Sequence, residues 1–205
     1  MSKLVSELVR IGTLQTSRTV DAFSEIGRIE FVPEEFVAQA DADVALPIGY
    51  GQTISQPSTV ALMFELLDPQ EGHKILDVGV GSGWTTALFA YIVGENGKVI
   101  GIERKEALKK IGEYNVDKFK YIKDGRVQIF LGDGSLGYPS EAPFDRILVS
   151  AVAEEIPEEL KKQLKVGGKM VIPVRNSLVF LEKKSEEEFS EEKYPGFSFV
   201  PLITS

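Results

Sequence analysis

Lys74–Trp84, KILDVGVGSGW, is the stretch that decides the fold of this chain. Its first half is a short apolar run typical of a buried strand, and its second half places glycine at alternate positions. The segment that follows, Trp84–Val93, is apolar on nearly every side and precedes Gly94, as expected of a buried helix. A strand, a glycine-rich turn and a buried helix in this order begin a βαβ unit around a parallel sheet.

The same alternation continues toward the C-terminus. Lys105–Lys120 is charged with an apolar stripe, and Ile156–Gly168 has Pro157 at a first turn and Gly167 at the predicted helix end. Alternating strands and helices predict an α/β fold with a Rossmann-like, doubly wound, mostly parallel sheet. The strand-like runs are Lys74–Val80, Lys98–Arg104, Arg126–Gly134, Phe144–Ala151 and Lys169–Val174.

The two ends of the chain follow other patterns. Residues 1–70 predict a helical cover: one helix before Gly27, a short helix after Pro33, an irregular loop at Leu46–Gln56, and a further helix with Ser58 as its N-cap. At the C-terminus, Ser177–Lys184 and Phe197–Thr204 read as two strands of a hairpin joined by a glutamate-rich turn. We expect one domain over 1–205, in which 71–205 supplies the sheet.

The composition excludes several classes of function. With 23 Lys+Arg against 31 Asp+Glu the formal charge is -8, which argues against nucleic acid as a ligand. The chain has no cysteine, which excludes disulfides, thiolate metal sites and a cysteine nucleophile, and we expect no metal. Glu7 interrupts the N-terminal apolar run, and no apolar segment approaches 18 residues. We therefore expect a cytoplasmic protein with no membrane partner, and a monomer.

The glycine turn indicates the kind of ligand. Gly79, Gly81 and Gly83 form G-x-G-x-G, whereas dinucleotide-binding turns read G-x-G-x-x-G, and here the last of those positions is Trp84. This spacing argues against NAD and favours a nucleoside ligand without phosphate, of which S-adenosylmethionine is the common one. The alternative is a turn that only lets strand and helix pack closely.

Acidic residues follow the next two predicted strands. Glu103 lies 20 residues beyond Gly83, the distance at which an acidic side chain accepts hydrogen bonds from ribose hydroxyls. Asp133, in GDG, lies at the end of the third strand, where a carboxylate can accept from an adenine amine. Because the carboxyl ends of parallel strands meet at one edge, these features converge on one ligand site.

The motifs together resemble one family. LPIGYGQTISQP, DVGVGSGW, GIER, GDG, APFDRILVSA, IPEEL, QLKVGGKMVIPV and FVPL are similar, in order, to motifs of the protein-L-isoaspartate O-methyltransferases. The resemblance implies a class I S-adenosylmethionine-dependent methyltransferase fold. It also implies methyl transfer to the free α-carboxylate of L-isoaspartyl residues in damaged proteins and peptides, after which the ester cyclises to a succinimide.

The resemblance also assigns residues. It implies Ser55 as the catalytic serine, and it places the bound peptide along Thr53, Ile54, Ser55, Val200, Pro201 and Leu202. The cofactor residues that it implies are Gln52, Thr53, Ile54, Asp77, Gly79, Gly81, Ser82, Gly83, Glu103, Arg104, Asp133 and Gly134. Asp77 and Val80 stand where many relatives have Glu and Thr, and the chain stops soon after FVPLI.

The implied chemistry needs no general base. The one histidine, His73, lies in a turn-like EGHK, and we expect it at the surface. A carboxylate nucleophile, with a pKa of ~3.9, is already ionised at neutral pH. Two other functions remain open at this stage: a class I methyltransferase for another carboxylate or a small molecule, and a binding module without turnover.

Overall fold

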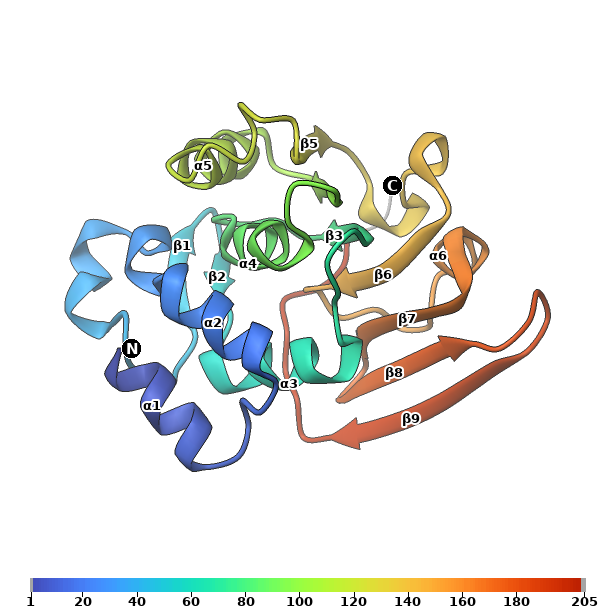
Figure 1. Ribbon diagram of the computed structural model, residues 1–205, viewed down its shortest axis with the longest axis horizontal. Helices are drawn as coiled ribbons and strands as arrows, with labels where there is room; N and C mark the ends of the chain where they lie inside the picture. The colour runs from blue at the N-terminus through green and yellow to red at the C-terminus, as the bar shows by residue number, and fades with distance from the viewer. Residues whose placement is uncertain (1, 204–205) are drawn as a thin grey trace.

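The computed structural model describes residues 2–203 and contains a seven-stranded sheet in the order β5-β4-β3-β6-β7-β8-β9 (Figure 1). The first five strands in that order are parallel, and β8 and β9 are antiparallel to their neighbours. Strand order reverses direction at β3 and β6, which is where open α/β sheets bind ligands. The strands are β3 Lys74–Val78, β4 Lys98–Glu103, β5 Val127–Leu131, β6 Phe144–Val149, β7 Leu164–Val174, β8 Ser177–Lys183 and β9 Phe189–Pro195.

Alternating side chains of the central strands build a core on each face of the sheet. Ile75 and Val99 face one apolar cluster, whereas Leu76 and Ile100 face the other. The first cluster is completed by α3 Pro57–Leu67, α4 Trp84–Val93 and α5 Glu106–Asp117. The second is covered by α6 Glu158–Gln163 and by Tyr138 and Ala142, in the segment that contains the short η3 Gly134–Leu136 and η4 Pro139–Glu141. Helices on both faces make the sheet doubly wound, which confirms the predicted fold class.

The N-terminal part packs on the α4 side of the sheet (Figure 1). Phe23, in α2 Ser17–Glu25, meets Phe64 of α3 and Trp84 of α4 edge to face, with ring centroids 5.8 and 5.4 Å away. The helix predicted before Gly27 is present, and the one after Pro33 is a 3-10 helix. The elements are α1 Lys3–Arg10, α2 Ser17–Glu25, η1 Arg28–Phe31, η2 Glu34–Gln39, β1 Leu46–Gly49 and β2 Gln52–Ile54.

Two expectations for this part were wrong in detail. Leu46–Gln56 is not irregular, because β1 and β2 pair antiparallel around Tyr50 and Gly51, both at positive φ. Ser58 is not the N-cap of α3, since Pro57 is the first helical residue. The Ser58 N–H is satisfied instead by the carboxylate of Asp43, at 2.8 Å.

The C-terminal predictions also needed correction. Gly167 lies inside β7 and not at the end of a helix, because α6 ends at Gln163 and the strand begins at once. The hairpin partner of β8 is β9, formed from the glutamate-rich segment, since the polar outer face of an edge strand tolerates these charges. Residues 197–203 leave the sheet edge and return to the end of β6. There Val152 N–H donates to Val200 O and Leu202 N–H to Val152 O, each at 2.8 Å.

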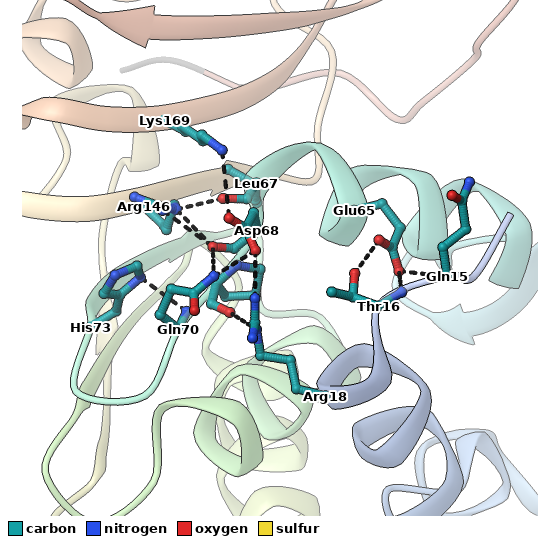
Figure 2. Close-up of polar contacts among 11 residues, drawn as sticks. Gln15, Thr16, Arg18, Glu65, Leu67, Asp68, Gln70, His73, Arg146 and Lys169 are labelled. Atoms are coloured by element: carbon teal, nitrogen blue, oxygen red, sulfur yellow. Dashed lines mark hydrogen bonds and ion pairs between the residues drawn. The ribbon is translucent and has the colours of Figure 1, made fainter.

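The last turn of α3 is fixed by cations (Figure 2). The guanidinium of Arg146, on β6, donates to the carbonyls of Leu67 and Asp68. Arg18 of α2 donates to the Asp68 carboxylate at 2.8 Å, and Lys169 of β7 lies 3.8 Å from it. Positive groups at a helix C-terminus interact favourably with the helix dipole, so α3 is held against the sheet and α2.

His73 lies half-buried beside this cluster and not at the surface as expected. Its Nδ1 accepts the Gln70 N–H at 3.1 Å, which requires that nitrogen to be unprotonated. Burial lowers the pKa of His73, and the nearby Arg146 lowers it further, against the opposing effects of Asp145 and Asp68. The folded protein therefore favours neutral His73.

Within residues 2–203, no helix combines the length and the apolar character needed to cross a membrane. The same residues contain no cluster of three or more His, Cys, Asp or Glu side chains arranged to hold a metal ion.

His73 predicts a pH-dependent stability. The pKa of His73 in the folded protein lies below the unfolded value of 6.5. As the pH falls below 6.5, the unfolded chain therefore binds more protons than the folded protein does, and the wild type loses stability until the pH has passed the folded pKa. His73→Asn keeps an acceptor for the Gln70 N–H and removes this titration. In urea titrations from pH 8 to 5, the wild type should lose up to ~1.4 kcal/mol of unfolding free energy per pH unit relative to the variant below pH 6.5. Parallel curves would contradict the assignment.

Candidate active site

A cavity opens at the carboxyl ends of β3 and β4, and we call it the strand-end cavity. Its floor is the glycine turn after β3, including Gly79, Gly81 and Ser82. Glu103 and Arg104 line it from the end of β4, and Gly132 and Gly134 follow β5. The β1–β2 hairpin and the C-terminal segment complete it with Gln52, Thr53, Ile54, Ser55, Val200, Pro201 and Leu202. Segments far apart in the sequence thus meet at one edge of the sheet, as predicted.

The three glycines of the turn have different roles. All three have positive φ, at 89° for Gly79, 55° for Gly81 and 95° for Gly83, a backbone region that favours glycine. Gly83 does not line the cavity, and a Cβ there would lie 2.9 Å from the Val116 side chain. Close packing against α5 is therefore the role of Gly83. Gly79 and Gly81 leave the backbone accessible from the cavity.

Glu103 holds the turn and also lines the cavity. Its Oε2 accepts the Gly81 N–H and its Oε1 accepts the Lys105 N–H, each at 2.9 Å. Each carboxylate oxygen retains a further lone pair for a donor such as a ribose hydroxyl. Sequence reasoning predicted a ligand role for this residue but did not predict its structural one.

Asp77 lies beneath the turn and is fully buried. Its Oδ2 accepts the hydroxyls of Thr85 and Thr86, at 2.8 and 2.6 Å. Within residues 2–203, its Oδ1 has no hydrogen-bond partner. Burial raises the pKa of Asp77 to about 6, against the Thr86 and Thr85 hydrogen bonds and with a smaller contribution from Glu103. A carboxylate with one unsatisfied buried oxygen favours a donor or a positive charge nearby.

Asp133 also lies behind the lining. Its Oδ1 accepts the N–H and the hydroxyl of Ser135, at 2.9 and 2.7 Å, and its Oδ2 lies 3.9 Å from Arg104. Gly134 lines the cavity, but a Cβ there would lie 2.2 Å from Val78, so packing alone requires glycine. The adenine contacts expected of these two residues stay a prediction.

Ser55, directly after the hairpin, is positioned by a buried arginine that the sequence did not reveal. Arg28 Nη2 donates to the carbonyl of Ser55 at 3.1 Å and to that of Val44 at 2.8 Å. Its Nη1 donates to Ala40 O and Ala42 O, at 3.1 and 3.2 Å. Burial lowers the pKa of Arg28 to about 10, while Asp43 and Asp41 raise it. The guanidinium therefore stays charged at neutral pH and fixes the hairpin from below.

A second cavity, which we call the hydroxyl groove, adjoins the first. It is lined by hydroxyl residues from the hairpin and α3, by Ser150, and by the C-terminal segment with Phe197 and Phe199. Among the described residues that line it, none carries a charge. The hydroxyl residues are Thr53, Ser55, Ser58, Thr59, Ser150 and Ser198.

Sequence reasoning missed one lining residue that it had the means to find. Ser150 follows β6 and lines both cavities, so the logic applied to the ends of β3, β4 and β5 would have identified it. Gly132 lines the strand-end cavity beside Gly134. Among the residues predicted for the cofactor, only Asp77, Gly83 and Asp133 stand outside the lining.

Comparison with known proteins identifies relatives of the whole chain. The family model described as protein-L-isoaspartate(D-aspartate) O-methyltransferase matches residues 1–205. A protein-L-isoaspartate O-methyltransferase of Methanopyrus kandleri is 46% identical over 205 residues, covering 98% of this chain and 90% of that protein. One from Archaeoglobus fulgidus is 43% identical over 201 residues, covering 98% and 92%.

A solved structure agrees with them. A Plasmodium falciparum protein assigned as a protein-L-isoaspartate O-methyltransferase, crystallised with S-adenosyl-L-homocysteine, superposes with a TM-score of 0.88. It is 27% identical, and the match covers 98% of this chain and 96% of that one.

The strand-end cavity fits S-adenosylmethionine, which carries a positive sulfonium, an ammonium group and two ribose hydroxyls. Glu103 offers acceptors for hydroxyl donors, and the buried Asp77 Oδ1 favours positive charge nearby. The open backbone at Gly79 and Gly81 leaves room for a ligand against the turn.

Glu103 is expected to govern cofactor affinity. Glu103→Gln replaces one acceptor oxygen by a donor, so the affinity for S-adenosylhomocysteine should fall by about 1.5–3 kcal/mol, the range for hydrogen bonds to a charged group. Calorimetry measures this, and Glu106→Gln, an exposed carboxylate on α5, is the matched control. Unchanged affinity in a folded Glu103→Gln protein would remove Glu103 from the site.

Arg28 is expected to stabilise the hairpin and the fold. Arg28→Lys keeps the charge but cannot reach the same carbonyls, so the unfolding free energy should fall by about 2–4 kcal/mol. The exposed Arg10→Lys is the control and should change it by less than about 0.5 kcal/mol. Denaturant titration gives both values, and equal losses for the two variants would contradict the role of Arg28.

Proposed function

This chain belongs to the protein-L-isoaspartate(D-aspartate) O-methyltransferase family, and from that premise we propose how its residues carry the reaction. The protein transfers a methyl group from S-adenosylmethionine to the free α-carboxylate of L-isoaspartyl residues in damaged proteins. One observation carries the assignment of roles: the strand-end cavity and the hydroxyl groove share Thr53, Ser55, Ser150 and Val200 in their linings. A methyl donor in one cavity and a carboxylate in the other meet at these residues.

Cofactor recognition is divided among the strand ends. Glu103 accepts the ribose hydroxyls, Gly79 and Gly81 let the methionine part lie against the backbone, and Asp77 favours its positive charge from beneath. Asp133 and Gly134 would contact the adenine, and Arg104 lies 3.9 Å from the Asp133 carboxylate. Gln52, Thr53 and Ile54 close the cavity from the hairpin, with Ser82 on the turn. All of these residues except Asp77 and Asp133 line the strand-end cavity together, which supports their roles.

The chemistry requires alignment and not proton transfer. When bound, S-adenosylmethionine supplies a methyl group on a positively charged sulfur, which leaves as a neutral thioether. The substrate carboxylate is ionised at neutral pH, and its own lone pair forms the new bond, so no residue of the protein exchanges a proton. Holding the reactants in line can supply roughly 7–11 kcal/mol of barrier reduction.

Ser55 is the residue proposed to hold the carboxylate. Its carbonyl is fixed by Arg28, which leaves the side chain on a rigid backbone at the junction of the two cavities. Its hydroxyl is a neutral donor, so it orients the carboxylate without pairing its charge as an arginine would. The peptide lies along the hydroxyl groove and Val200–Leu202.

The remaining partners follow from charge. A formal charge of -8 is unfavourable for nucleic acid, and the uncharged groove suits protein segments. We propose a cytoplasmic monomer whose partners are isoaspartyl peptides and proteins.

The substrate assignment predicts a sharp discrimination. Two peptides that differ only in an aspartyl or isoaspartyl linkage should differ by more than ~100-fold in labelled methyl incorporation, because a misplacement of about 1 Å can cost that much. The ester formed should release methanol in mild base as the adjacent backbone nitrogen closes a succinimide. Equal labelling, or a base-stable product, would favour another methyltransferase substrate. Cofactor binding without labelling of either peptide would indicate an inactive module.

A further inference from the structure

Ser150 is the one serine besides Ser55 that lines both the strand-end cavity and the hydroxyl groove, among the residues that the structure describes. The two serines come from different elements, Ser55 from the turn between β2 and α3, and Ser150 from the residue after β6. They therefore border the junction of the cavities from two independent parts of the fold.

The backbone at Ser150 is held on both sides. Its N–H donates to Val78 O at 2.8 Å, which fixes it to the end of β3 beside Gly79. Two residues later, Val152 exchanges hydrogen bonds with Val200 and Leu202 of the C-terminal segment. Ser150 is thus placed by the sheet, as Ser55 is placed by Arg28.

Both hydroxyls are available to a ligand. Within residues 2–203, the structure records no hydrogen bond for the side-chain hydroxyl of either serine. Both residues are half-buried, so a group entering the junction can reach them. No charged side chain among the described residues lines the groove beside them.

A carboxylate at this junction has two oxygens to be held. A single hydroxyl fixes one oxygen but leaves the group free to rotate about that hydrogen bond. A second donor from a different element defines the plane of the carboxylate, and so the direction of the lone pair that attacks. Neutral donors do this without pairing the charge.

We propose that Ser150 is a second carboxylate-binding residue: its hydroxyl donates to one oxygen of the isoaspartyl α-carboxylate while Ser55 donates to the other. The inference rests on the proposed methyltransferase function. Neither hydroxyl loses its proton. Because hydrogen bonds hold the backbone of each serine separately, the two hydroxyls together fix the orientation of the attacking carboxylate.

Three substitutions separate the hydroxyl from the shape of the side chain. Ser150→Ala removes the hydroxyl, while Ser150→Thr and Ser150→Val have nearly the same shape and differ in carrying or lacking it. With an isoaspartyl peptide, kcat should fall about 10- to 100-fold in the Ala and Val variants, as for loss of one positioning hydrogen bond. The Thr variant should stay within about fivefold of wild type. Ser140→Ala, exposed on η4, is the control.

Binding and stability measurements exclude other roles. Affinity for S-adenosylhomocysteine and the melting temperature should be unchanged in the Ala, Thr and Val variants. Because Ser55 and Ser150 are proposed to hold one group, the losses in Ser55→Ala and Ser150→Ala should not multiply in the double variant. A fully multiplicative loss would overturn this shared role.

The outcomes distinguish this inference from the proposed function. If the wild type methylates no isoaspartyl peptide, the proposed function itself fails. If the wild type is active and the Val variant equals the Thr variant, the Ser150 hydroxyl has no role and the inference is overturned. A loss of S-adenosylhomocysteine affinity at unchanged kcat would also overturn it, because Ser150 would then be a cofactor residue.

Discussion

A buried guanidinium is the constraint on which the site depends. Arg28 donates to the carbonyls of Ala40, Ala42, Val44, Ile54 and Ser55, which lie on either side of the β1–β2 hairpin and at its end. Its guanidinium also lies 5.6 Å from the ring centroid of Trp84, the first residue of α4 after the glycine turn. One charged group therefore connects the segment that ends at Ser55 to the helix that follows the glycine turn. Desolvating a charge is unfavourable, so a loss of these carbonyl partners would destabilise the whole region.

Arg28 is not the only group that holds the N-terminal part on the sheet, because α3 is also fixed at its C-terminal end. Arg146 and Lys169, from two neighbouring strands, meet the carbonyls and carboxylate at Asp68 (Figure 2). The helix begins directly after the Ser55–Gln56 turn, so its position sets where that turn lies. Because β6 supplies both Arg146 and the residue before Ser150, the same strand anchors α3 at one end and borders the junction at the other.

The sequence predicted the features that follow from hydrophobic periodicity and from the residues at strand ends. Alternating apolar runs gave the parallel sheet, and the ends of β3 and β4 gave Gly79, Gly81 and Glu103, which do line the cavity. It could not predict Arg28 or the Asp43 cap of α3, because a side chain that bonds to distant backbone carbonyls or N–H groups leaves no periodic trace. The C-terminal strand was misplaced for a related reason. Glutamates in β9 lie on an exposed edge, where charge is favourable and hydrophobic pattern is weak.

Charge is distributed between the two cavities in a way that matches the charges consumed by the reaction. At the strand-end cavity, Asp77 and Glu103 lie close enough to affect each other and Arg104 and Lys105 also line the space, whereas the described lining of the hydroxyl groove is neutral. In the proposed arrangement, the sulfonium lies on the side of Asp77 and Glu103, and neutral donors hold the substrate carboxylate in the groove. Methyl transfer converts both reactants to neutral groups, so the transition state carries less charge than the bound reactants. The neutral donors that we propose, Ser55 and Ser150, would therefore stabilise the ionic ground state less than an arginine would, which leaves more of the binding free energy to favour the transition state.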